Sequence, residues 1–278
     1  LQMNATVNAP QVDVKAIGKV AVLLGGRSAE REVSLMSGTG VLAALKAKGV
    51  DAHAFDPAER DLGDLKREGF ARCFIALHGR FGEDGTVQGF FDTLEIPYAG
   101  GGVLDSALCM DKHFMKIVLQ AAGIPVAPWV TVREGEVDAS PTVRTAIDAL
   151  GLPLFVKPAR AGSSVGVSKV SAIDELPEAL AVAFAEDDKV LIESAIVGRE
   201  IEVAILDGRG GTPPRASLPG EVVLTTRDFY DFEGKYLGGD GVSIVCPAEV
   251  SLAELAQMQA LGVRAFQAVG GRGLARVD

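Results

Sequence analysis

Short apolar runs alternate with an amphipathic segment near the start of the chain. Val20–Leu24 is an uninterrupted apolar run that ends at two glycines, which is typical of a buried strand. Residues 31–48 carry apolar side chains at helical spacing, and the glycine that follows them is a common helix stop. Two further apolar runs predict strands at Ala52–Phe55 and Phe74–Leu77. This order of strand, helix and strand predicts a first α/β domain with a parallel sheet.

A glycine-rich segment at residues 99–102 precedes a helical stretch at residues 110–122, which itself ends at a glycine. We therefore place a domain boundary near residue 102. The elements expected after it are, in chain order, strands at 154–157 and 167–170, a helix at 175–186 with Asp174 as its N-cap, strands at 190–193 and 201–205, a loop at 209–220, a helix opened by the capping box of Ser251 and Glu254, and a strand at 274–278.

The composition indicates a globular protein without a membrane span or a nucleic-acid surface. Of its 278 residues, 48% are apolar, which is enough for a sizeable core. The longest apolar runs are far shorter than the ~20 residues that cross a bilayer, and residues 1–15 lack the pattern of a secretory signal. The net charge of −10 would repel a polyanion. Three cysteines without metal-type spacing are expected to be reduced core residues of a cytoplasmic protein: Cys73, Cys109 and Cys246.

The segment at residues 157–166 has the composition of a phosphate-binding loop. A predicted strand ends at Lys157, and the loop that follows contains glycines and the two hydroxyls of Ser163 and Ser164. Glycines let the backbone approach an anion, hydroxyls add donors, and a lysine supplies positive charge. The lysine precedes the glycines, so the segment is not a Walker loop. A Gly/Ser hairpin with a surface lysine remains the alternative from the residues alone.

Polar residues also follow the ends of two predicted parallel strands. Glu32 and Ser34 follow the first strand, and His78 opens a loop at residues 78–85 after another. Ligands gather at the carboxyl edge of a parallel sheet, so both segments are candidate parts of a binding site. The first glycines lack the G-x-G-x-x-G spacing of a dinucleotide site, which disfavours a dehydrogenase. A solvated helix start and a structural histidine remain the alternatives here.

Taken together, five motifs resemble those of the D-alanine:D-alanine ligase family, in the same order along the chain: residues 23–34, 78–85, 110–112, 162–166 and 229–236. The resemblance runs from about residue 18 to the last residue. It implies an ATP-grasp fold, in which two α+β subdomains hold ATP behind an N-terminal α/β domain. It also implies ATP-dependent joining of two D-alanines through an acyl phosphate, for peptidoglycan synthesis in the bacterial cytoplasm.

The resemblance implies how the chain divides. The expected parts are a flexible extension at 1–17, an N-terminal α/β substrate domain at 18–102, a central ATP-grasp subdomain at 103–196 and a C-terminal ATP-grasp subdomain at 197–278 whose last part is truncated. A homodimer is expected on the same ground.

The resemblance also assigns residues to the nucleotide. Lys112 and Lys157 would hold ATP phosphates, as would the hydroxyls of the Gly/Ser loop, and Lys235 would reach the transferring γ-phosphate. Glu193 would read the adenine edge, and Glu200 would bind the ribose hydroxyls. Phosphoryl transfer depends on such cations more than on covalent help from the protein.

Other residues are assigned to the amino-acid substrates by the same resemblance. Glu32 would bind the ammonium group of the first D-alanine, and His78 would lie near its carboxylate. Arg276 would stabilise the oxyanion that forms when the second amine attacks. Ser163 and Tyr230 would form hydrogen bonds with Glu32 and close the loop over the site, excluding the water that hydrolyses acyl phosphates.

Mg²⁺ or Mn²⁺ is the metal that the resemblance implies, with Asp278 as the first ligand. The sequence given holds no counterpart of the Glu and Asn ligands that follow it in the family. Two alternatives therefore stay open at this point: another ATP-grasp carboxylate-amine ligase, and a truncated, non-catalytic nucleotide-binding form.

Overall fold

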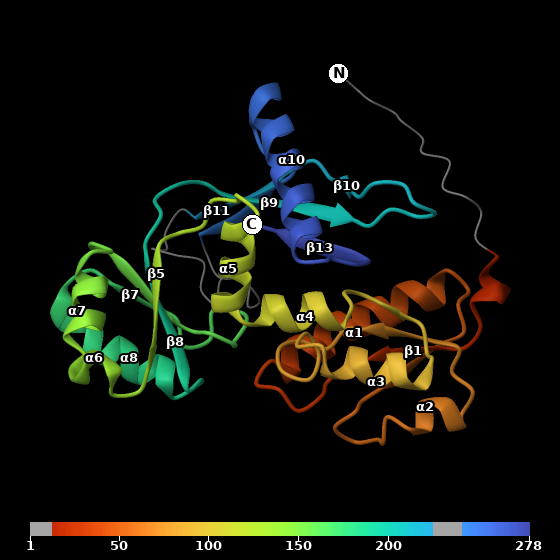
Figure 1. Ribbon diagram of the computed structural model, residues 1–278. Helices are drawn as coiled ribbons and strands as arrows, with labels where there is room; N and C mark the ends of the chain where they lie inside the picture. The colour runs from red at the N-terminus through yellow and green to blue at the C-terminus, as the bar shows by residue number, and fades with distance from the viewer. Residues whose placement is uncertain (1–12, 225–240) are drawn as a thin grey trace.

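The computed structural model describes residues 13–224 and 241–278, whose strands form three sheets. Figure 1 shows three parts of the chain in different regions of the molecule. They contain α1 (Arg31–Ala47) and α3 (Thr86–Leu94), then α6 (Glu136–Ala139) to α8 (Leu176–Phe184), and finally α10 (Leu252–Ala268). The helices α4 (Val103–Met110) and α5 (Lys112–Ala121) lie between them. No helix of the described residues is long and apolar enough to span a bilayer.

The first sheet is parallel, as predicted, with the strand order β2-β1-β3-β4. Two strands lie as expected, whereas β3 begins two residues before the predicted run. A short helix, α2 (Asp64–Arg67), and a 3-10 turn at Val14–Ile17 accompany this sheet. The strands are β1 (Val20–Leu23), β2 (Ala52–Phe55), β3 (Arg72–Ile75) and β4 (Tyr98–Ala99).

Both faces of β1 are covered, which explains its unbroken apolar sequence. Leu23 packs with Phe91 of α3 (Thr86–Leu94) on one face. Val22 lies on the other face, under the apolar side chains of α1 (Arg31–Ala47). The predicted helix at 31–48 is therefore confirmed. The two helices leave the carboxyl edge of the sheet open for the loops that follow β1 and β3.

The helical stretch predicted at residues 110–122 corresponds to α5, which begins at Lys112, and a break at Asp111 separates it from α4. Asp111 has an extended backbone conformation, with φ −91° and ψ 99°, and separates α4 from α5. Its carboxylate accepts hydrogen bonds from the amides of His113 and Phe114, so it caps α5. The break turns the first residues of α5 toward the second sheet.

The second sheet is antiparallel, with the order β5-β8-β6-β7. One face of the sheet is covered by α6 (Glu136–Ala139), α7 and α8, and an apolar core lies between the sheet and these helices. The strands and remaining helices are β5 (Trp129–Arg133), β6 (Leu154–Pro158), β7 (Ser168–Val170), β8 (Lys189–Ser194), α7 (Pro141–Asp148) and α8 (Leu176–Phe184).

The N-cap predicted for α8 is wrong. Asp174 lies inside a 3-10 turn at Ile173–Glu175, and α8 begins after that turn. The Glu175 carboxylate accepts the amide of Ser171 at 2.7 Å, so it stabilises the turn in place of an Asp174 cap.

The third sheet has the order β10-β9-β11-β12, and β13 pairs with β9. The predicted capping box of Ser251 and Glu254 is confirmed at the start of α10, whose Phe266 packs on Ile205 of the sheet. The segment predicted as a loop at 209–220 contains the short β10. The bounds are β9 (Glu200–Leu206), β10 (Arg215–Ala216), β11 (Gly220–Leu224), β12 (Val242–Val245), α10 (Leu252–Ala268) and β13 (Leu274–Val277).

The three cysteines are free thiols, but the prediction that all of them lie in the core is wrong. Cys73 is a buried residue of β3 in the first sheet, whereas Cys109 and Cys246 are exposed. Cys109 lies on an open side of α4, and Cys246 follows the end of β12.

Two glycines on α1 provide a test of how this helix packs. A Cβ atom at Gly38 would overlap the side chain of Leu24, whereas one at Gly40 would meet nothing within 4 Å. We predict that Gly40→Ala raises the free energy of unfolding by about 1 kcal/mol, because alanine is the better helix former. Gly38→Ala should lower it by about 1–3 kcal/mol through overpacking. Urea denaturation measures both, and stabilisation by both substitutions would contradict the packing of α1 on β1.

Candidate functional site

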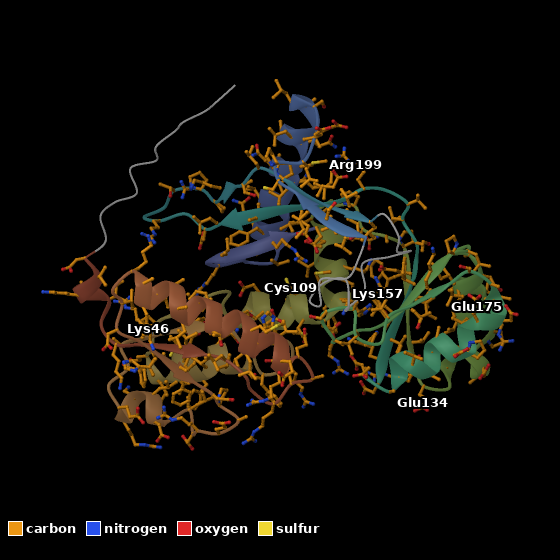
Figure 2. The ribbon with its side chains drawn as sticks, turned by 180° about the vertical axis from the view of Figure 1, so that it is seen from behind. Lys46, Cys109, Glu134, Lys157, Glu175 and Arg199 are labelled. Carbon is orange, nitrogen blue, oxygen red and sulfur yellow. The ribbon has the colours of Figure 1, made fainter. Side chains whose placement is uncertain are left out.

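Three lysines and one glutamate gather between α5 and the uncovered face of the second sheet. Lys112 and Lys116 are one helical turn apart on α5, so they lie on one side of it. Lys157 comes from β6 and Glu193 from β8. Figure 2 shows Lys157 near the middle of the molecule, whereas Glu134 and Glu175 lie at the outer edge of the same part of the chain. The group carries two more positive charges than negative ones.

Glu193 is paired with a lysine on each of its oxygens. Lys157 binds Oε1, and the Nζ of Lys116 lies 2.8 Å from Oε2. The side chains of Lys116 and Glu193 are only 9% and 12% exposed. Burial alone would raise the pKa of Glu193, but the two ammonium groups hold it below its usual value. Glu193 is therefore a carboxylate that can only accept hydrogen bonds.

Lys112 is held against the stem of the Gly/Ser loop. Its Nζ donates to the carbonyl of Pro158 at 3.1 Å and to that of Ala161. Burial, reinforced by repulsion from Lys157, lowers the pKa of Lys112 to about 8. The carboxylates near Lys112 therefore do not offset its burial, and an anionic ligand beside it would raise its pKa again.

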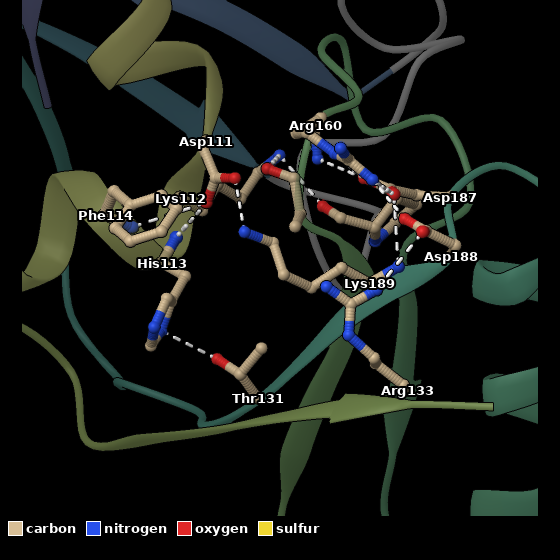
Figure 3. A network of polar contacts seen from close by, with 12 residues as sticks. Asp111, Lys112, His113, Phe114, Thr131, Arg133, Arg160, Asp187, Asp188 and Lys189 are labelled. Atoms are coloured by element: carbon tan, nitrogen blue, oxygen red, sulfur yellow. Dashed lines mark hydrogen bonds and ion pairs between the residues drawn. The ribbon is translucent and has the colours of Figure 1, made fainter. Parts of the chain in front are cut away.

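A network of ion pairs holds the residues at the start of the Gly/Ser loop in place (Figure 3). The Arg160 amide donates to Asp187 at 2.7 Å, and its guanidinium binds the same carboxylate. This pairing raises the pKa of Arg160, and it holds the pKa of Asp187 low against the opposing effect of burial. Asp111 and Lys189 form a second buried pair, which joins the start of α5 to the start of β8. The base of the loop is therefore anchored on both sides.

The loop itself has a backbone that favours close approach. Ser163 and Ser164 have positive φ values of 54° and 60°, and Gly166 has 69°. Such conformations in residues other than glycine cost energy and occur often at ligand sites. The loop connects β6 to β7, and Lys157 lies near the end of β6, just before the loop begins.

The predicted contact between Ser163 and Glu32 is wrong. The Ser163 hydroxyl donates to Glu30, whose side chain is buried, whereas Glu32 lies on the exposed side of α1. The two glutamates are two residues apart at the start of a helix, and a helical step of that size turns the second away from the first. Glu30 therefore joins the loop of the second sheet to the carboxyl edge of the first sheet.

Glu30 has close neighbours in the loop that follows β3. A Cβ atom at Gly79 would overlap the Glu30 carboxylate, and Gly79 has a φ of 64°, so glycine suits this position on both grounds. The Gly79 amide donates to Glu83 at 2.7 Å. Burial raises the pKa of Glu83, and the nearby Glu30 acts in the same direction. Two carboxyl groups therefore lie near each other where the first and second sheets meet.

His78 lies at the same edge. Its Nε2 is 2.9 Å from the hydroxyl of Ser37, and the Ser28 hydroxyl donates to its carbonyl. The Ser37 hydroxyl is also 2.9 Å from the Val33 carbonyl, to which it can donate its proton. A neutral His78 ring would then donate from Nε2 and keep Nδ1 as an acceptor. A cavity of about 480 Å³ opens beside His78 and Ser28.

A second cavity, of about 540 Å³, brings the end of the chain to this edge. Arg276 and Asp278 from the β13 segment and Glu83 from the loop after β3 line it together. The Arg276 guanidinium donates to Asp278 at 2.7 and 2.9 Å and lies 3.3 Å from Glu202. Arg276 is therefore near the edge that carries Glu30 and His78, although it pairs with acidic groups of its own sheet.

The described residues do not assemble a metal site. Within residues 13–224 and 241–278, no group of three His, Cys, Asp or Glu side chains could hold an ion. Asp278, the predicted ligand, has both carboxylate oxygens bonded to Arg276. The described residues therefore offer Mg²⁺ a single carboxylate that is already paired with a guanidinium, which does not make a metal site.

The remaining predicted residues lie apart from these groups or outside the described part. Glu200 is exposed at the start of β9. Tyr230 and Lys235 lie outside the described residues. Three side chains of the site were not singled out from the sequence: Glu30, Glu83 and Lys116. Glu83 lies in the motif at residues 78–85, and Lys116 could have been found from its helical spacing of four from Lys112.

Comparison with known proteins gives a consistent result. The family model described as the D-ala D-ala ligase C-terminus matches residues 118–278, and the model of the corresponding N-terminus matches residues 51–101. The chain is 50% identical to a D-alanine–D-alanine ligase of Delftia acidovorans over 269 residues, which cover 96% of this chain and 79% of that protein. It is 47% identical to one of Ralstonia pickettii over 270 residues, which cover 97% and 78%.

The buried pair of Asp111 and Lys189 provides a test of the network under the loop. Lys189→Met would leave the Asp111 carboxylate buried without its partner, so we predict a loss of about 3 kcal/mol in the free energy of unfolding. Arg133→Gln breaks an exposed pair with Asp188 in the same network and should change it by about 0.5 kcal/mol or less. Equal losses in the two variants, measured by urea denaturation, would contradict this account of the network.

Proposed function

The chain belongs to the D-alanine–D-alanine ligase family, and from that premise we propose that it uses ATP to join two D-alanines into the dipeptide of peptidoglycan precursors. A carboxylate oxygen of the first D-alanine attacks the γ-phosphorus of ATP, which gives an acyl phosphate and ADP. The amine of the second D-alanine, after losing its proton, attacks the acyl carbon. Phosphate leaves with the carboxylate oxygen, and a peptide bond replaces the acyl phosphate bond.

The lysine group beneath the Gly/Ser loop is the observation that carries this proposal. Lys116 and Lys157 share the carboxylate of Glu193, and the pKa of Lys112 is lowered by burial and by Lys157 despite the attraction of nearby carboxylates. Buried charges of one sign are costly unless a ligand compensates them. A di- or triphosphate next to the loop would do so, and its phosphates would receive donors from Lys112, Lys157 and the loop.

We propose that the second and third sheets are the two α+β subdomains of an ATP-grasp fold, divided near residue 197, and that the first sheet up to about residue 102 forms the substrate domain. Both ATP-grasp units contain an antiparallel sheet covered by helices on one face. Their open faces would enclose the nucleotide. We also expect a homodimer in the bacterial cytoplasm, where ATP is available, and light scattering of the purified protein measures its mass.

The amino-acid roles follow from the edge where the sheets meet. We propose that Glu30, in place of Glu32, binds the ammonium group of the first D-alanine, because it is buried and joined to the loop through Ser163. The same hydrogen bond holds the loop over the acyl phosphate and excludes water. His78 would lie near the substrate carboxylate, and Arg276 would stabilise the oxyanion. Tyr230 would help to close the loop over the site, and Lys235 would bind the γ-phosphate, as the resemblance implies.

The direct test is an assay with purified protein, ATP and D-alanine. The proposal expects D-alanyl-D-alanine, ADP and phosphate in equal amounts, with little product when L-alanine or D-lactate replaces D-alanine. Phosphate release with another amino acid alone would favour a different carboxylate-amine ligase. Nucleotide binding without turnover under any of these conditions would favour the non-catalytic form.

Glu30 and Glu32 form a matched pair for locating the substrate ammonium. We predict that Glu30→Gln lowers kcat/KM for D-alanine by at least ~100-fold, since the charged contact with the substrate is lost and the hydrogen bond from Ser163 is weakened. Glu32→Gln should stay within about threefold of the unmodified protein, because that side chain is exposed. A large loss in the Glu32 variant with a small one in the Glu30 variant would restore the assignment made from the sequence.

The low pKa of Lys112 predicts a pH dependence of nucleotide affinity. The free protein loses the Lys112 charge above pH 8, so ADP should bind up to tenfold more weakly for each pH unit above that value. Lys112→Arg keeps its charge throughout this range, and its affinity should change little between pH 7 and 9.5. Calorimetry with ADP measures both proteins, and a flat profile for the unmodified protein would contradict the assignment.

A further inference from the structure

Lys116 lies in the charged group, but none of the roles proposed above belongs to it. We propose that Lys116 is a positioning residue that holds Glu193 against the nucleotide base, so that the site selects a purine with an amino group, and not a carbonyl oxygen, at C6. This inference rests on the proposed nucleotide site and adds to it a residue and a basis for base selectivity.

The contacts of Lys116 fix its ammonium group in one place. Its Nζ lies 2.8 Å from Glu193 Oε2 and 3.0 Å from the carbonyl of Ala127. It also lies over the ring of Trp129, 5.3 Å from the centroid. The side chain is almost completely buried. A lysine held by these three contacts cannot follow a phosphate group, so its charge stays with Glu193.

Lys157, the other partner of Glu193, is in a different position. It is more exposed than Lys116, and it lies on the strand that leads directly into the Gly/Ser loop. Phosphates bound under that loop would compete with Glu193 for its ammonium. Glu193 would then depend on Lys116 to remain ionised and in place, because a buried carboxylate without a cation is costly.

The strand register places Glu193 where a flat ring could lie. Glu193 is paired across the sheet with Trp129 on one side and Phe155 on the other. Residues paired in this way share one face of an antiparallel sheet. An acceptor flanked by two aromatic residues is suited to the edge of a planar base.

Base selectivity follows from the chemistry of the acceptor. An ionised carboxylate has no proton to donate. The amino group of adenine can donate to it, whereas the carbonyl oxygen that guanine carries at the same ring position would face it as a second acceptor. Leaving two acceptors facing each other in a buried site is strongly unfavourable. Lys116 maintains this selectivity by keeping Glu193 charged.

The test compares ADP and GDP binding by calorimetry in full-length variants. The unmodified protein should bind ADP at least ~10-fold more tightly than GDP. Lys116→Met keeps the packing of the side chain without its charge, and it should weaken ADP binding about tenfold and GDP binding much less, so that the preference falls. Its ADP affinity should also decrease more on acidification than that of the unmodified protein, because loss of the Lys116 charge removes one of the two cations that hold the pKa of Glu193 low. Lys116→Arg should retain the preference for ADP.

The controls separate this role from a structural one. Lys46→Met, at an exposed position on α1, should leave both affinities unchanged. Glu193→Gln presents an amide that can also donate, so it should shift preference toward GDP. If Lys116→Met does not fold, Lys116→Gln removes the charge while keeping a donor, and the same fall in preference is expected.

The outcomes that overturn the proposal are distinct. Equal weakening of ADP and GDP by Lys116→Met would show that Lys116 only supports the fold of the site. An unchanged ADP preference would show that Glu193 does not depend on it. Both results leave the proposed ligase function standing. Failure of the unmodified protein to bind either nucleotide would overturn the proposed function together with this inference.

Discussion

The structure depends on one electrostatic constraint, the excess of positive charge between α5 and the second sheet. Lys116 and Lys157 share the carboxylate of Glu193 there, and burial, reinforced by repulsion from Lys157, lowers the pKa of Lys112 to about 8. A folded chain keeps such a group only if the surrounding network is rigid. The pairs of Arg160 with Asp187 and of Asp111 with Lys189 supply that rigidity, and in the proposed function a bound nucleotide phosphate balances the positive charge.

The three sheets meet around this group. The Gly/Ser loop that follows β6 contacts the first part of the chain through the hydrogen bond from Ser163 to Glu30. The end of β13 reaches the same edge across a cavity shared by Arg276 and Glu83. In the proposed function, the groups that bind phosphate and those that bind the amino acid therefore come from different sheets. A ligase needs this arrangement, because an acyl phosphate must form and be consumed without meeting water.

The sequence predicts the regular elements well where local patterns decide them. The apolar run at Val20–Leu24, the helix of 31–48 and the Ser251 capping box all correspond to elements of the structure. Elements set by distant contacts were missed, including β5 and β11, whose strands are recognisable mainly through their partners. The same limit applies to the site. Motif matching pointed to Glu32, and the choice of Glu30 requires knowing which side of α1 faces the loop.

The central claim is that ATP activates a carboxylate of D-alanine at this site. Turnover of D-alanine labelled with ¹⁸O in its carboxylate, followed by mass spectrometry of the released phosphate, tests it most directly. The account predicts one labelled oxygen in each phosphate formed together with the dipeptide, because the acyl phosphate breaks between carbon and that oxygen. Unlabelled phosphate accompanying the dipeptide would contradict it, since the carboxylate would then not have been phosphorylated.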